Sequence, residues 1–135
     1  MAGWLLPALG YVVLVGVAGI TTKLGLKTID WQQIVYWVPV AYAVLSALLW
    51  LVFQKPMVLG TGGGWAIVTA FAAAGGLICF FYALSKGDAS VVVPTTSAYP
   101  VIALIGGAIF LSESITVPKV IGTVLVIAGV VVISL

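Results

Sequence analysis

Residues 90–111 of the chain read SVVVPTTSAYPVIALIGGAIFL and contain no charged side chain, although Asp88 and Glu113 lie just outside them. A helix needs about 20 mostly apolar residues to cross the hydrocarbon core of a bilayer, which is about 30 Å thick. The stretch is long enough for one crossing, and its ends carry the charges expected at a membrane surface. It therefore predicts a transmembrane helix.

The same pattern extends over the rest of the chain, because the charged residues fall in small groups between long uncharged runs. These runs are continuously apolar and lack the period-two alternation of a transmembrane β-barrel. We therefore expect an all-α integral membrane protein whose five transmembrane helices form a single domain over residues 1–135. The expected helices are residues 3–22, 31–53, 65–84, 90–111 and 117–135.

Glycines at positions 60 and 62–64 interrupt the pattern before the third expected helix. A phosphate-binding loop would need a Lys-Ser or Lys-Thr pair after its glycines, and Trp65-Ala66 stands there instead. We therefore interpret Gly60–Gly64 as a flexible connector.

Composition excludes several classes of protein. The 135 residues are 64% hydrophobic and 6% charged, whereas about 25% of the residues of a soluble domain are charged. The chain has no His and one Cys, and its three acids all fall at helix ends, which leaves no pattern for acid–base catalysis or a metal site. We expect no enzyme activity, no catalytic or metal-binding residues and no cofactor. A net charge of +2 is too small for a nucleic-acid surface.

The fourth expected helix combines two prolines with hydroxyl side chains at mid-membrane depth. Pro94 and Pro100 each remove one backbone hydrogen bond and should kink the helix. Freed backbone groups are tolerated at this depth only inside protein or beside a wet cavity. One interpretation is a polar cavity in which Thr95, Thr96 and Tyr99 bind a solute. The alternative is a kinked packing helix whose hydroxyls hydrogen-bond to their own backbone carbonyls.

Two smaller features concern packing and charge. Gly122 and Gly129 lie two helical turns apart on one face of the last expected helix, where small residues allow close helix contact. A seam between subunits and ordinary packing within one chain are both consistent with this spacing. Lys23 and Lys27, one turn apart, are expected to extend to lipid headgroups. Glu113 is expected to pair with a lysine or a helix N-terminus.

The lysines give almost no orientation signal. Five crossings would put Lys55 and Lys119 on the side of the N-terminus and Lys23, Lys27 and Lys86 on the other side. Lysine and arginine near helix ends set orientation, so two against three is nearly no bias. Either other cues orient the chain, or copies insert in both directions and pair antiparallel.

The second half of the chain resembles the EamA domain of the drug/metabolite transporter superfamily. The resemblance covers about residues 78–133 and rests on an ordered set of matches: Tyr82-Ala83-Leu84-Ser85-Lys86-Gly87-Asp88, Val93-Pro94, Tyr99-Pro100, Leu111-Ser112-Glu113, Ile121-Gly122 and Ala128-Gly129-Val130. The first two helices match by length and hydropathy alone. They lack the Trp-Gly and the Arg common in the family, so the resemblance does not transfer a substrate.

This resemblance implies a transporter architecture. Most relatives contain two five-helix repeats of opposite orientation, whereas this chain is similar to one repeat and would pair with an inverted copy or a complementary half. The central cavity of the family would bring Tyr82, Thr95, Thr96 and Tyr99 near the solute, with Trp37 as a further aromatic wall. The related small multidrug resistance proteins couple protons through a carboxylate in their first helix, and residues 3–22 contain none.

From these observations we expect a secondary transporter of a small organic metabolite or drug-like solute. It would work by alternating access as an antiparallel homodimer, surrounded by lipid in the cell membrane, the inner membrane of a prokaryote. The alternative is a membrane assembly partner that transports nothing itself, or one half of a heterodimeric transporter.

Overall fold

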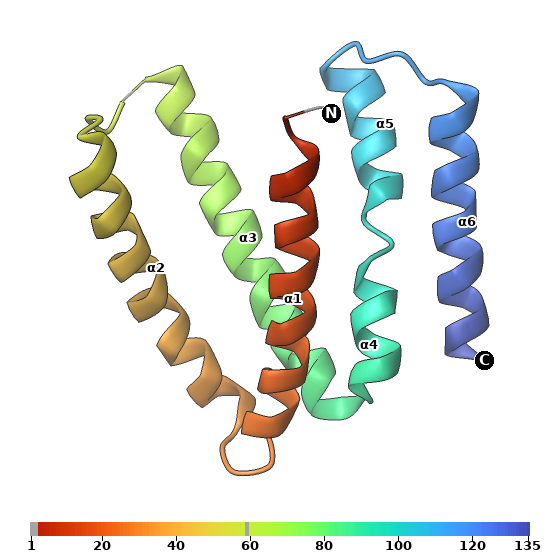
Figure 1. The fold of residues 1–135 in the computed structure, drawn as a ribbon, viewed down its shortest axis with the longest axis horizontal. Helices are drawn as coiled ribbons and strands as arrows, with labels where there is room; N and C mark the ends of the chain where they lie inside the picture. Colours follow the sequence, from red (N-terminus) through yellow and green to blue (C-terminus); the bar gives the residue numbers. More distant parts are fainter. Residues whose placement is uncertain (1–2, 59) are drawn as a thin grey trace. The chain divides into compact units, whose positions relative to one another are not determined.

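A computed structural model describes residues 3–58 and 60–135. In these residues the structure is helical and contains no strand (Figure 1). Five helical spans are long and apolar enough to cross a membrane: Leu5–Gly25, Trp31–Phe53, Thr61–Lys86, Ala89–Phe110 and Val117–Ser134. The predicted all-α membrane fold is confirmed.

The helices fall into two compact units, Met1–Lys86 and Gly87–Leu135. In the first unit, α3 (Thr61–Lys86) packs against both α1 (Leu5–Gly25) and α2 (Trp31–Phe53). In the second unit, α6 (Val117–Ser134) packs against α4 (Ala89–Thr96) and α5 (Pro100–Phe110). That the whole chain acts as one domain remains a prediction.

Very little of the described chain is buried. Phe81 and Leu84 in α3 are its buried hydrophobic residues, and Thr22 in α1 is its buried polar residue. The large apolar side chains of α2 and α6 are mostly exposed, as expected for helices whose neighbours are lipid tails or other helices.

The N-terminus of α2 shows how local sequence sets the helix boundaries. Asp30 is the N-cap residue, and its backbone N–H donates a hydrogen bond of 2.9 Å to the side-chain oxygen of Gln33. At the other end, Gln54 adopts a left-handed conformation with φ of 48° and donates its N–H to the carbonyl of Trp50. Pro39 lies inside α2 and does not break it.

The interpretation of Gly60–Gly64 as a flexible connector is wrong for most of this segment. Gly60 has φ of +109°, a turn conformation that favours glycine, but α3 already begins at Thr61. The N–H of Gly64 bonds to the carbonyl of Gly60 at 2.8 Å, which closes the first helical turn. A Cβ on Gly63 would collide with the carbonyl of Val58. Gly63 is therefore needed for close backbone approach.

The other boundaries differ less from those expected. The first helix continues to Gly25 and the third to Lys86, so Lys23 and Lys86 both lie in last turns. Lysine side chains interact favourably with the carbonyl groups at a helix C-terminus, which lets α1 extend past Lys23 and α3 include Lys86. The fourth expected helix, residues 90–111, is two helices, α4 and α5.

Candidate functional site

The fourth span is interrupted at its centre. α4 ends at Thr96 and α5 begins at Pro100, so Ser97, Ala98 and Tyr99 lie between them (Figure 1). Here the backbone forms tighter i→i+3 hydrogen bonds, from Ser97 N–H to the Pro94 carbonyl at 2.9 Å and from Ala98 N–H to the Thr95 carbonyl at 3.2 Å. Such a stretch in mid-helix often marks a functional hinge or a sequence under strain.

Proline alone does not explain the interruption, because Pro39 and Pro94 both lie inside continuous helices. The difference near Pro100 is the run of hydroxyl side chains before it. Ser and Thr compete for backbone carbonyls and bend helices when they do so. Pro100 then lacks the N–H that would bond to the Thr96 carbonyl. Both effects act on the same turn.

The three hydroxyls hydrogen-bond to their own helix. The Thr95 hydroxyl donates to the Val91 carbonyl at 2.7 Å, and the hydroxyls of Thr96 and Ser97 both donate to the Val93 carbonyl, at 2.8 and 3.1 Å. These are the hydrogen bonds expected for a kinked packing helix whose hydroxyls bond to their own backbone carbonyls. They use each hydroxyl proton but leave the oxygen able to accept a second bond, since a hydroxyl has two lone pairs. Binding of a solute here stays a prediction.

A shallow, open hollow of about 370 Å³ lies beside the break, within the second unit. Its polar lining residue is Ser97, next to Pro94 at the kink. The other lining residues are apolar and come from α4 and α6: Val93, Leu125, Val126, Gly129, Val130 and Ile133. The hollow is mostly apolar and open, whereas the usual small-molecule site is a concave cleft that encloses most of its ligand. Thr95, Thr96 and Tyr99 are exposed but are not among its lining residues.

The two aromatic residues predicted as further walls, Tyr82 and Trp37, belong to the first unit. The Tyr82 ring meets the Trp31 ring edge to face at 5.5 Å between centroids, and the Lys86 amine lies 5.7 Å from the Tyr82 ring centre. Lys86 is in the last turn of α3, which gives Tyr82 a membrane-surface environment. Trp37 is 69% exposed on α2. A role for either residue in solute binding remains a prediction.

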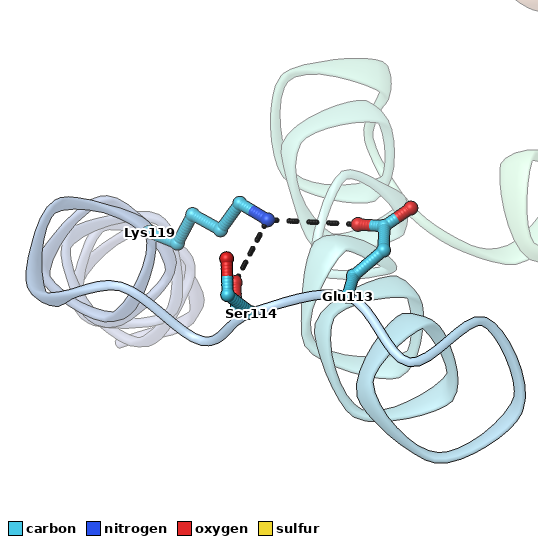
Figure 2. Close-up of polar contacts among 3 residues, drawn as sticks. All are labelled: Glu113, Ser114 and Lys119. Carbon is cyan, nitrogen blue, oxygen red and sulfur yellow. Dashed lines mark hydrogen bonds and ion pairs between the residues drawn. The ribbon is translucent and has the colours of Figure 1, made fainter.

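Glu113 closes the turn between α5 and α6. Its carboxylate lies 3.5 Å from the Lys119 amine, which also donates a 3.0 Å hydrogen bond to the Ser114 carbonyl (Figure 2). The Glu113 N–H bonds to the carbonyl of Gly107 at 3.0 Å. Both charged side chains are about half exposed, so the pair contributes little stability, about 0–1 kcal/mol. The expected pairing of Glu113 with a lysine is confirmed.

Lys23 makes a contact that the sequence interpretation missed. Its amine donates a 3.0 Å hydrogen bond to the backbone carbonyl of Leu84, in the last turn of α3. Leu84 is 0% exposed, so this lysine joins α1 to the most buried point of the first unit. The spacing of Lys23 and Lys27 suggested that both would contact lipid headgroups in the same way. Only the packing of α1 against α3 distinguishes the two lysines.

A packing role for Gly122 and Gly129 of α6 remains a prediction. Among the described residues, nothing lies within 4 Å of a Cβ added at Gly122 or Gly129. The same part of the chain contains no group of three His, Cys, Asp or Glu residues that could hold a metal ion.

These features define a class: a multi-pass helical membrane protein with one discontinuous span. The chain belongs to the EamA-like transporter family, whose model matches residues 2–135, and the predicted resemblance is thereby confirmed. It is also similar to the uncharacterized protein MJ1333.1 of Methanocaldococcus jannaschii, with 41% identity over 71 residues. That match spans about half of each protein, 53% of this chain and 52% of the relative. No solved structure matches the chain.

Proposed function

We propose that this protein is a secondary transporter of a small organic solute and not an enzyme. The observation that carries the proposal is the break between α4 and α5, which interrupts the helix near the middle of a candidate membrane span. Transporters commonly bind their solutes near the bilayer midplane at such discontinuous helices. Thr95, Thr96 and Tyr99 would bind the solute by hydrogen bonds and stacking.

Alternating access would then require a second five-helix repeat. The described spans supply five crossings, and transporter folds of this type work by rocking two inverted repeats around a shared site. We infer that an antiparallel homodimer provides the second repeat. The near balance of lysines on the two sides supports insertion in both orientations.

Removal of two hydroxyl groups tests the site. Thr96→Val keeps the side-chain shape and Tyr99→Phe keeps the ring, so the double variant should fold normally. We expect it to reduce flux of labelled small metabolites into proteoliposomes to the level of empty vesicles, because both hydroxyl contacts with the solute are lost.

The matched control makes the same chemical changes elsewhere, Thr123→Val in α6 with Tyr42→Phe in α2. Thr123 also donates its hydroxyl proton to a carbonyl of its own helix, that of Lys119 at 2.9 Å. The control should transport as the unmodified protein does. Normal flux through the Thr96→Val/Tyr99→Phe variant would remove the assignment of the site.

A second candidate function is assembly with another membrane protein, including a complementary half of a transporter. The open space beside Gly122 and Gly129 favours it, since small residues on a helix face allow another helix to approach closely. Reconstitution distinguishes the two functions. Flux by this chain alone supports the homodimeric transporter, and flux only after a second half is added supports the partner.

A further inference from the structure

A second, partly open hollow of about 350 Å³ lies at one end of the first unit, where the connector after α1 and the start of α2 meet the end of α3 (Figure 1). Because three membrane spans begin or end here, the hollow lies at a membrane surface and not at mid-depth. Its lining residues are the polar Asp30, Gln32, Ser85 and Lys86, together with Leu26, Ile29 and Trp31.

This hollow, which we call the headgroup hollow, carries one charge of each sign. Lys86 is the last residue of α3, and Asp30 is the N-cap residue of α2. Within residues 3–58 and 60–135, no ion pair joins Lys86 to Asp30. Asp30 also forms a capping box with Gln33, but a carboxylate has about four lone-pair sites and capping uses one of them. Each charge can therefore bind the opposite charge of one ligand.

Aromatic rings position the Lys86 amine beside the headgroup hollow. The amine lies 5.7 Å from the centre of the Tyr82 ring, which is within the range of a cation–π interaction. The Tyr82 ring in turn meets the Trp31 ring edge to face, with 5.5 Å between centroids. Trp31 lines the hollow and has an indole N–H, which can donate to an anionic oxygen. Lys86 and Trp31 are thus suited to a phosphate group.

The opposite part of the lining favours a cation that donates hydrogen bonds. The Ser85 hydroxyl donates its proton to the Tyr82 carbonyl at 2.6 Å, so its oxygen remains as an acceptor. The Asp30 carboxylate and the amide oxygen of Gln32 are acceptors as well. A primary ammonium has three N–H donors for these oxygens, whereas a quaternary ammonium has none. The lining therefore distinguishes the two kinds of cation.

We propose that the headgroup hollow binds a membrane phospholipid whose headgroup carries a phosphate diester and a primary ammonium, as phosphatidylethanolamine does. The phosphate pairs with Lys86 and accepts the indole N–H of Trp31, and the ammonium donates to Asp30 and Ser85. The ligand is a lipid because headgroups are the neighbouring molecules at the end of a membrane span. This site is separate from the break in the fourth span and does not depend on the proposed transport function.

Three lipids with identical acyl chains test the headgroup preference: phosphatidylethanolamine, phosphatidylcholine and phosphatidylglycerol. Each is titrated into the purified protein in detergent, and native mass spectrometry measures the fraction of protein with bound lipid. We expect phosphatidylethanolamine to bind about three- to tenfold more tightly than either of the others. Choline keeps the positive charge but donates no hydrogen bond, and phosphatidylglycerol has no ammonium for Asp30.

Two substitutions separate the contacts of the phosphate from those of the ammonium. Lys86→Gln should weaken binding of phosphatidylethanolamine and phosphatidylcholine alike by about three- to tenfold, because both carry the phosphate. Asp30→Asn should weaken binding of phosphatidylethanolamine alone, and asparagine caps a helix as well as aspartate does, so the start of α2 is kept. The matched controls are Lys27→Gln and Asp88→Asn, exposed residues that do not line the hollow, and both should bind lipid as the unmodified protein does.

Several results would overturn the proposal. Equal affinity for the three lipids, or phosphatidylglycerol that binds as tightly as phosphatidylethanolamine, would mean unspecific attraction between lysines and headgroups. Equal losses in Lys86→Gln and Lys27→Gln would mean the same. The ranking of lipids uses the unmodified protein, so it does not depend on the folding of any variant.

Glycerophosphoethanolamine tests whether the ligand is a lipid, because it has the same headgroup and no acyl chains. We expect it to compete for the site much more weakly than the lipid does, since the apolar contacts of the chains with the helices are lost. Competition at the same concentration as the lipid would overturn the assignment to a lipid and indicate a soluble phosphoethanolamine ligand.

Discussion

Lys23 and Lys27 lie one helical turn apart, yet their ammonium groups meet different surroundings. Lys23 is partly buried and bonds to the Leu84 carbonyl, whereas Lys27 is exposed. A hydrogen bond from a charged donor contributes about 1.5–3 kcal/mol, and partial exposure reduces this. We expect Lys23→Met to lower the free energy of unfolding in detergent by about 1–2 kcal/mol, measured by thermal circular dichroism.

Lys27→Met is the matched control for that measurement, because it removes the same charge from the same end of the first unit. We expect it to change stability by less than about 0.5 kcal/mol, as surface substitutions usually do. Equal losses in the two variants would mean that the Lys23–Leu84 bond does not hold α1 against α3.

At the scale of elements, the start of α3 offers a sharper comparison between neighbouring glycines. Nothing described lies within 4 Å of a Cβ at Gly62, whereas a Cβ at Gly63 would collide with the Val58 carbonyl. Gly62→Ala should therefore stabilise the protein by up to about 1 kcal/mol through helix propensity. Gly63→Ala should destabilise it by about 1–3 kcal/mol through overpacking. Thermal unfolding in detergent measures both, and a stabilising Gly63→Ala would show that the turn before α3 is not fixed.

The sequence predicted the long elements well and the interruptions poorly. Uncharged runs of sufficient length specify membrane helices directly, which is why α2 was predicted with its observed bounds, residues 31–53. The helical glycines at the start of α3 and the full break at residues 97–99 depend on which backbone bonds form in three dimensions. Pro39 lies inside a continuous helix, whereas Pro100 is the first residue of α5, after the break.

The candidate site was also predicted only in part. Two prolines among hydroxyl residues indicated a perturbed span at Pro94–Pro100, and the perturbation is there. The involvement of Ser97 in the hollow beside the break could not be read from the sequence, because the lining residues of α6 lie more than twenty-five positions further along the chain. The partner of Lys23 was missed for the same reason.

For the molecule as a whole, the question is orientation, because an antiparallel dimer needs copies inserted both ways. In a chain that crosses the membrane five times, Lys55 after α2 and Lys119 in the first turn of α6 would face the side opposite Lys23, Lys27 and Lys86. Because the lysines on the two sides are nearly balanced, two added lysines on one side should change the orientation in which the chain inserts. Met57 and Ile115 are exposed residues between helices, so both accept lysine without loss of packing.

We expect Met57→Lys with Ile115→Lys to turn a mixed population into one orientation, with these connectors on the cytoplasmic side. Labelling of a single cysteine at either terminus in intact cells, in a variant without Cys79, measures the accessible fraction. Met57→Gln with Ile115→Gln is the uncharged control and should stay mixed. Because a dimer of inverted copies needs both orientations, the lysine variant should also lose solute flux, and co-expression with an oppositely biased variant should restore it. An unmodified protein that is labelled from one side only would exclude the antiparallel homodimer and favour a separate partner half.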